Sequence, residues 1–475
     1  GTQNVAVGSL ALDANTTTSN NTAVGYAALS ANTADGNVAF GHRTLTSNTT
    51  GAGNVAVGKD ALYTNTTGNY CIAVGYDALQ QNNGNDNVAI GHDAMKLNTT
   101  GSGNVSMGSN SLDANTTGYE NTAIGRSALG TNTTGGENTA VGYFALLNNL
   151  SASGNTGVGE QALMENTTGA SNTAVGGKAL DANTTGSNNV AIGQGALTAS
   201  TTAGQNVAVG RQALTTSTTA GFNTAIGYQA LYQATTCDYN VAIGHKSMSN
   251  ATVTGDNNVA VGRNSLYSCT GGNHNTAVGG SATLYGCTTG TYNTAVGVDA
   301  GQNVSSGSNM TLIGYQAGTS GGAGGIHVAE SNRIILGNSS VTNFIAQVAL
   351  TVASDERDKT DITDFTKGLD IINALRPVTY KWDNRVRYGT EENPYGTPDG
   401  SKKSSKLNIG LIAQEVETVE KANGYASSDD DMLFINKSTD GLNYGLTYER
   451  LIPVLVNAIK ELSAEVEQLK SQLNN

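Results

Sequence analysis

The chain has 475 residues, of which 61 are glycines and only 13% are charged, and its formal net charge is −13. Nucleic-acid binding is excluded as a function, because phosphates require a cationic surface. Membrane insertion is also not expected, since no apolar run approaches the roughly 20 residues of a membrane span. The chain opens at Gly1 without a recognisable signal peptide, and we expect an attachment segment to precede it.

The composition changes sharply near residue 354. Residues 1–353 hold 9 Lys/Arg and 16 Asp/Glu, whereas residues 354–475 hold the other 15 and 21. All four prolines and the one tryptophan, Trp382, also follow the change. We therefore expect a repeat stalk over 1–320, an irregular β transition over 321–353 and a separate domain over 354–475.

A repeat close to Asn-(Val/Thr)-Ala-(Val/Ile)-Gly runs through the stalk. Its glycines recur every 16 to 18 residues, too few for the helical repeats of known solenoids. The repeat glycines are Gly8, Gly25, Gly41, Gly58, Gly75, Gly91, Gly108, Gly125, Gly142, Gly159, Gly176, Gly193, Gly210, Gly227, Gly244, Gly262, Gly279, Gly297 and Gly314.

The period predicts a mainly β fold, a parallel β-solenoid (β-roll) of about 19 coils of 17 residues. Each coil is expected to have two short strands and two turns, with Gly and Asn at corners of positive φ. Stacked Val/Ile, Ala and Leu should form the core, and stacked Asn side chains should bond one another along the fibre. Cys269 and Cys287 occupy equivalent positions in neighbouring repeats, so their pairing is left open; Cys71 and Cys237 stand alone, and no metal or cofactor is expected.

A coil this thin buries little apolar surface to offset its ordering entropy, so we expect a homotrimer. The repeat resembles the β-roll heads of trimeric autotransporter adhesins, and it is more similar still to repeats in bacteriophage tail fibres. These resemblances imply a trimeric shaft.

The residue directly after the repeat glycine is the most variable one and is often polar or aromatic. Such a row should face outward, where aromatic and Arg side chains are typical of contact surfaces. A host receptor, glycan or protein, is one interpretation, and a merely solvated face is the other. The histidines in this row lie too many coils apart to share a metal. The candidate contact row is Tyr26, Tyr76, Arg126, Tyr143, Arg211 and Tyr228.

The junction after the stalk reads Ser354-Asp355-Glu356-Arg357-Asp358-Lys359. It resembles the start of the intramolecular chaperone domain of phage tail fibres and endosialidases. The resemblance continues through Leu369–Trp382, Ile409–Val416 and Tyr444–Leu455. It implies an α+β domain that assists trimer assembly and then releases itself.

The resemblance implies a Ser/Lys dyad, with Ser354 as nucleophile, Lys359 as base, and a cut between Ala353 and Ser354. Asp355 and Arg357 would support the site. A serine needs a base to take its proton, and a lysine can act as that base once burial disfavours its charged form. The enzyme would be a single-turnover serine endopeptidase acting only on its own chain. An ordinary polar linker is the alternative.

The C-terminal residues predict a helix with a heptad seam at Ile459, Leu462, Val466, Leu469 and Leu473. A coiled coil would hold three chains in register, and a helix packed in a domain core is the alternative.

Taken together, the patterns predict a phage tail fibre, made in the host cytoplasm and carried on the virion with other tail proteins. A bacterial trimeric surface adhesin and a polysaccharide-degrading tailspike are the alternatives. The stalk offers no repeated carboxylate pair of the kind that glycosidases use.

Overall fold

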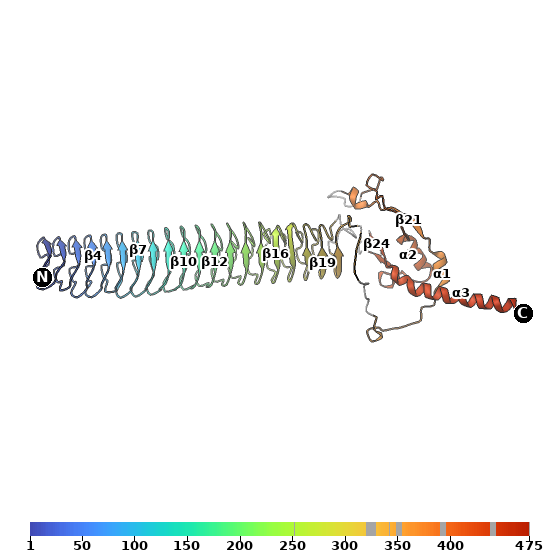
Figure 1. The fold of residues 1–475 in the computed structure, drawn as a ribbon, viewed down its shortest axis with the longest axis horizontal. Coiled ribbons are helices and arrows are strands. Elements are labelled where there is room, and N and C mark those ends of the chain that lie inside the picture. Colours follow the sequence, from blue (N-terminus) through green and yellow to red (C-terminus); the bar gives the residue numbers. More distant parts are fainter. Residues whose placement is uncertain are drawn as a thin grey trace. The chain divides into compact units, whose positions relative to one another are not determined.

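The computed structural model describes residues 1–250, 252–319, 329–341, 343–347, 354–389, 396–437 and 443–474. The chain divides into two compact units, Gly1–Thr311 and Leu312–Asn475. In the first unit the chain winds into a stack of similar coils (Figure 1). Among the described residues no helix has the length and apolarity of a membrane span.

Each coil contributes one short strand that ends at or close to the repeat glycine. Strands β1 to β18 pair consecutively, parallel and in register, so that Ala123 of one coil lies beside Ala140 of the next. The predicted parallel β-solenoid with a 17-residue coil is confirmed. The strands are β1 Val5–Val7, β2 Thr22–Val24, β3 Val38–Phe40, β4 Val55–Val57, β5 Ile72–Val74, β6 Val88–Ile90, β7 Val105–Met107, β8 Thr122–Ile124, β9 Thr139–Val141, β10 Thr156–Val158, β11 Thr173–Val175, β12 Val190–Ile192, β13 Val207–Val209, β14 Thr224–Ile226, β15 Val241–Ile243, β16 Val259–Arg263, β17 Thr276–Ser281, β18 Thr294–Val296, β19 Met310–Ile313 and β20 Arg333–Leu336.

The predicted second strand of each coil is wrong. The coil returns through a stack of turns, because two residues on that side adopt left-handed backbone conformations. In one coil these are Ser127 with φ 54° and Leu129 with φ 52°. A strand requires negative φ throughout. The turns are still bonded from coil to coil, as where the Leu129 amide donates to the Ala145 carbonyl at 3.0 Å.

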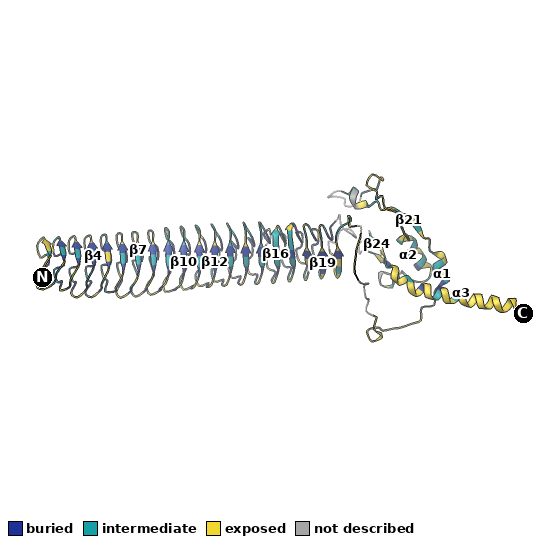
Figure 2. Ribbon diagram, in the orientation of Figure 1, coloured by how far each residue is buried: buried dark blue, intermediate teal, exposed yellow. Residues whose placement is uncertain are grey.

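The core differs from the predicted one in a further respect. The Ala in the middle of each strand points inward, and so does the Leu four residues after the glycine; Ala39, Ala56 and Leu62 are fully buried. Because side chains alternate along a strand, the Val/Ile beside that Ala faces outward instead of joining the core. Phe40 and Met107, which occupy the same position, are 55% and 40% exposed. The core is therefore lined by Ala, Leu and Asn. Figure 2 shows that buried residues recur along the stack of coils.

Two ladders of buried asparagines follow the solenoid axis, as predicted. In the first, each side-chain amide donates to the side-chain oxygen one coil earlier: Asn132 Nδ2 reaches Asn115 Oδ1 at 3.0 Å, and Asn149 Nδ2 reaches Asn132 Oδ1 at 3.0 Å. This ladder runs from Asn32 to Asn183. In the second, the Asn before a strand accepts the next coil's backbone N–H, as Asn104 Oδ1 does at 2.9 Å from the Asn121 amide, and Cys71 interrupts this ladder before β5.

All four cysteines lie buried in the first unit as free thiols. Cys269 and Cys287 stand where earlier coils have the first-ladder Asn, and each donates to a glycine carbonyl of its own coil. Burial raises the pKa of Cys269 to about 11 and that of Cys287 to about 12. Cys269 and Cys287 therefore do not form a disulfide here; both are reduced thiols.

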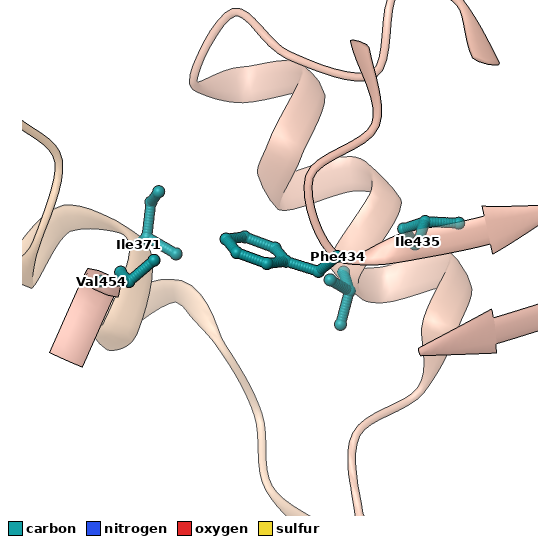
Figure 3. Close-up of a cluster of buried hydrophobic side chains, with 5 residues drawn as sticks. Ile371, Phe434, Ile435 and Val454 are labelled. Carbon is teal, nitrogen blue, oxygen red and sulfur yellow. The ribbon is translucent and has the colours of Figure 1, made fainter. Parts of the chain in front are cut away.

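The second unit holds helices and two antiparallel strand pairs around a small core. The side chains of Ile371, Phe434 and Val454 point toward one another there, with Val416 and Ile435 beside them (Figure 3). The elements are η1 Glu356–Asp358, α1 Leu369–Ala374, β21 Val378–Tyr380 paired with β22 Asn408–Gly410, η2 Arg385–Tyr388, α2 Ala413–Ala422, η3 Asp429–Asp431, β23 Ile435–Lys437 paired with β24 Tyr444–Leu446, η4 Tyr448–Arg450 and α3 Leu451–Leu473. Of the β transition expected over 321–353, residues 333–336 form β20 and residues 343–347 form no strand, while 321–328, 342 and 348–353 lie outside the described residues.

Helix α3 confirms the predicted C-terminal helix. Its Val454 and Ala458 are buried, and Glu461 Oε2 accepts the Leu369 N–H at the start of α1 at 2.7 Å. The residues of the predicted seam lie on another face of α3 and take no part in the core of this domain. Its residues are exposed by 64% at Ile459, 52% at Leu462, 41% at Val466, 58% at Leu469 and 85% at Leu473.

Candidate functional site

Ser354 and Lys359 lie in contact at the start of the C-terminal domain. Lys359 Nζ is 2.7 Å from Ser354 Oγ and 3.3 Å from the Ser354 carbonyl oxygen. Both residues are exposed. Serine hydroxyl and lysine amine thus meet the distance that proton transfer requires. Ala353, on the other side of the predicted cut, lies outside the described residues.

A single turn of 3₁₀ helix, η1, brings these two side chains together. Asp355 caps it, accepting the Arg357 backbone N–H at 3.0 Å, and its carboxylate also forms a 2.6 Å ion pair with Arg357. The Arg357 side chain and that backbone N–H hold the pKa of Asp355 below its usual range. Asp355 and Arg357 therefore shape the turn by bonding to each other, whereas the hydrogen bond of Ser354 Oγ is to Lys359.

The candidate contact row lies on the surface of the first unit. Tyr26, Tyr76, Tyr143 and Tyr228 are 37–49% exposed, and Arg126 and Arg211 are also exposed. Several rings stack on the histidine of the following coil. The centroid distances are 5.3 Å for Tyr26–His42, 5.2 Å for Tyr76–His92 and 5.3 Å for Tyr228–His245.

Sequence reasoning missed a network of carboxylates next to this row. Asp60 and Asp77, the second residues after their repeat glycines, are almost fully buried, and Asp60 forms a 2.8 Å ion pair with Arg43. Lys96 bridges Asp77 and Asp93, at 3.0 Å from each. The signal was the recurrence of Asp two residues after three successive repeat glycines. Since each acid has a cation beside it, the network is one of ion pairs; over the described ranges no group of three His, Cys, Asp or Glu is placed to hold a metal.

Glu420 is a second residue that the sequence reasoning missed, in the C-terminal domain. It is 1% exposed, and its carboxylate accepts the backbone N–H groups of Phe434 at 2.6 Å and Leu433 at 3.3 Å. A carboxylate bonded by two backbone amides fixes α2 against β23, which is a structural role. An open apolar pocket of about 340 Å³ lies nearby, lined by Phe365, Leu433, Phe434, Arg450, Pro453 and Val454.

The family model described as the chaperone of endosialidase matches residues 354–425. The match begins at Ser354 and includes Lys359, η1, α1 and α2. It covers less than half of the chain. No curated protein matches the chain. The match implies a self-cleaving chaperone domain with peptidase-type activity. The match and the β-solenoid before it together fit a protein of the tailspike or endosialidase type with a C-terminal chaperone domain.

Proposed function

We propose that this chain is the trimeric shaft of a phage tail fibre, which binds a host receptor, and that residues 354–475 assist its assembly and then cut themselves off before Ser354. The observation that carries the proposal is the Ser354–Lys359 contact of 2.7 Å at the first residue of the family match. The fibre would be made in the host cytoplasm, join other tail proteins and remain on the virion.

An apolar outer face of the solenoid supports the trimer. In β1 to β18 the outward side chain at the first position is Val, Ile or Thr, and the last position is mostly Val or Ile. This stripe continues over the coils, and many of its residues are exposed in a single chain, among them Val57, Ile90 and Ile192. Monomeric proteins rarely leave so long an apolar surface open to water. Three copies that pack this sheet face around a common axis bury it.

The seam of α3 supports three-chain assembly at the other end of the chain. Exposed Ile452 and Leu455 extend the spacing of Ile459 and Leu462 toward the start of the helix. Alternating steps of three and four residues along one face are the pattern of a coiled coil. A local coiled coil holds three chains together while the non-local pairing of the solenoid proceeds.

The cleavage that we propose starts with attack of Ser354 Oγ on the carbonyl carbon of Ala353, while Lys359 takes the hydroxyl proton. The C–N bond breaks, the Ser354 nitrogen receives the proton as an amine, and an ester to Oγ remains. Water then hydrolyses this ester, so the net reaction consumes one water molecule. A lysine base must be uncharged, and burial disfavours the charged form. Because the dyad of one chain is exposed, packing in the trimer would supply that burial and make cleavage follow assembly.

The candidate contact row would meet the receptor, a glycan or a protein of the host surface. Its exposed tyrosines present apolar rings with a polar tip, and Arg126 and Arg211 add cations to the same row. Aromatic and Arg side chains of this kind dominate the energetics of contact surfaces.

Intact mass spectrometry of the purified full chain tests the cleavage. We expect the wild type to separate into residues 1–353 and 354–475, and both Ser354→Ala and Lys359→Met to remain whole. Thr360→Ala is the matched control, since Thr360 is an exposed hydroxyl next to Lys359 without a part in the dyad, and it should cleave like the wild type. A wild-type trimer that stays whole, or a Ser354→Ala chain that is cut at the same bond, would show the assignment to be wrong.

A further inference from the structure

The two ends of each strand define two edges of the solenoid. The head edge consists of the two residues directly after each repeat glycine. The tail edge consists of the fifth and sixth residues before it. The buried Asn before each strand lies four residues before the repeat glycine. At 3.3 Å per residue, the two are about 13 Å apart. The head and tail edges of one coil therefore do not meet within a chain. The strands run side by side in one direction (Figure 1), which keeps each edge continuous.

The charges of the stalk are distributed unevenly between these edges. The head edge has seven of the eight Lys/Arg residues of 1–320 together with five acids, whereas the tail edge has six acidic residues and no Lys or Arg. The head-edge acids are Asp60, Asp77, Asp93, Glu160 and Asp299. The head-edge cations are Arg43, Lys59, Arg126, Lys178, Arg211, Lys246 and Arg263, and the tail-edge acids are Asp35, Asp86, Glu120, Glu137, Asp238 and Asp256.

Some of the cations have partners within the chain and others do not. Arg43 and Lys59 both form ion pairs with Asp60. Arg126, Lys246 and Arg263 form no ion pair with any described residue of their own chain.

The coils of these three unpaired cations all have an acid on the opposite edge. Glu120 lies six residues before Arg126, Asp238 eight before Lys246, and Asp256 seven before Arg263. Glu120 is exposed, and Asp238 and Asp256 are half-buried. Asp238 and Asp256 each accept one backbone N–H of the preceding coil, from Gly221 at 2.7 Å and from Asp238 at 2.8 Å. None of the three acids is paired with the cation of its own coil, so each coil presents two complementary charges that a second molecule could join.

Threefold packing of the apolar sheet faces brings such edges together. If three copies pack their apolar sheet faces around one axis, equal coils lie at equal height. Their strands then follow one another head to tail around the axis. The head edge of each copy consequently meets the tail edge of the next copy at the same coil.

We propose that the partner of the head edge is the tail edge of a second copy of this chain, and that same-coil ion pairs set the axial register of the fibre. The proposal rests on the trimer of the proposed function and adds its seam. Arg126 pairs with Glu120 of the neighbouring copy, Lys246 with its Asp238 and Arg263 with its Asp256. Lys178 and Arg211 lie outside this scheme, because their coils have Ser171 and Gln205 on the tail edge. A slip by one coil would break all three pairs and offer fewer in their place, since in one direction it brings only Arg126 opposite Glu137 and Lys246 opposite Asp256. The correct register therefore has the most ion pairs. Because the contact row shares the head edge, a receptor would be bound along the seam between two copies.

Cysteine cross-linking of the full chain tests the seam. A chain with both Arg126→Cys and Glu120→Cys is treated with a short bismaleimide and run on a denaturing gel, while light scattering gives its oligomeric state. We expect covalent trimers, at least tenfold more than in either single variant. Native thiols do not interfere, since all four are buried. The matched control combines Arg126→Cys with Asp238→Cys, seven coils away and thus about 34 Å along the axis, and should give no covalent trimer.

The outcomes separate the two proposals. A trimer by light scattering whose matched cysteines do not link overturns the seam and leaves the trimer standing. Covalent dimers from Arg126→Cys alone would mean that head edges meet each other, which also overturns it. A chain that is no trimer at all overturns the assembly on which the seam rests.

Charge reversal tests whether the contact is an ion pair. Arg126→Glu and Glu120→Arg should each lower the midpoint of thermal dissociation of the trimer by a few degrees, and the double variant should recover it. Arg211→Glu, which has Gln205 on the tail edge of its coil, should change the midpoint less. A double variant no better than the sum of its singles would contradict the pairing.

Discussion

The glycine that ends each strand illustrates how strongly single residues constrain this fold. Gly176 has φ +131°, and a Cβ there would lie 2.7 Å from the backbone carbonyl carbon of Gly193 in the next coil. Gly177 has no such φ, and its Cβ would approach nothing closer than 4.0 Å. Two adjacent glycines therefore have different reasons to be present.

We expect Gly176→Ala to destabilise the solenoid by roughly 1–3 kcal/mol, the cost of a strained backbone conformation, and Gly177→Ala to change it by less than about 0.5 kcal/mol. Chemical denaturation followed by circular dichroism measures both. Equal effects of the two substitutions would contradict this account of the repeat glycine.

The buried thiols lead to a prediction about pH. Because burial raises the pKa of Cys269 to about 11 and of Cys287 to about 12 from an ordinary 9.0, the folded chain keeps both protons where an unfolded chain releases them. Their contribution to stability is complete below about pH 9 and is lost as pH rises toward 12.

Iodoacetamide at pH 8.5 should accordingly leave the native chain unmodified and label it fully in denaturant, as mass spectrometry can count. The matched comparison is Ser268→Cys, a half-buried neighbour of Cys269, which should react in the native chain. Rapid native labelling of Cys269 or Cys287 would show that the coil around them opens.

At the same scale, the orientation of the strand residues marks a limit of sequence reasoning. Ala and Val/Ile are both apolar, so hydrophobicity alone does not tell which of them faces the core of a three-residue strand. The variation among repeats distinguishes the two positions. The inward position takes only small side chains over most of the stalk, with Ser106 and Gly157 as its variants, whereas the outward one accepts Phe40 and Met107.

Among the elements, the first asparagine ladder shows what the repeat encodes. It ends at Asn183, because the next coil has Ser200 in its place, and this leaves Asn183 Oδ1 and Ser200 Oγ buried without a partner. Unpaired buried polar atoms cost about 1–3 kcal/mol each.

Ser200→Asn should therefore extend the ladder by one step and stabilise the solenoid by about 1 kcal/mol. The reciprocal substitution, Asn132→Ser, removes bonds to Asn115 and Gly135 and from Asn149, and should destabilise it. Thermal unfolding of the two variants beside the wild type gives the comparison, and shifts of the same sign in both would refute the ladder argument.

The ladders and the strands were predictable because each depends only on the 17-residue period, which stacks like residues. The absence of a second strand was not predictable, because an Ala-Leu sequence does not indicate that its leucine adopts a left-handed conformation. Leu129 and the Leu or Met equivalent to it in the other coils adopt φ near +50°, a conformation that costs an L-residue energy. In the last two coils Gly301 and Gly318 occupy this position at φ 64° and 70°. Stacked inter-coil hydrogen bonds on both sides of it supply the compensation, and these exist only in the assembled solenoid.

For the molecule as a whole, composition predicts a change of chemistry near residue 354, whereas the two compact units of the structure divide between Thr311 and Leu312. Ser354 and Lys359 could be singled out by resemblance, and their 2.7 Å contact is local, made by one 3₁₀ turn. The residues that would surround Ser354 and Lys359 in an assembly come from distant parts of the chain or from other copies, so the local sequence does not reveal them. The head and tail edges likewise emerge only when the coil is folded, because Arg126 and Glu120 are near in sequence and yet flank opposite ends of one strand.

The end of the asparagine ladder also has a mechanical meaning. Hydrogen bonds between coils point along the solenoid axis, so a pull along this axis loads every coil interface in series, and the weakest one yields first. Beyond Asn183 no residue at the ladder position carries a side-chain amide; these positions are Ser200, Ser217, Ala234, Ala251, Cys269, Cys287 and Val304. We expect these later coils to unwind first under tension, each lengthening from about 4.8 Å to nearly 60 Å of extended chain, while the earlier coils stay wound.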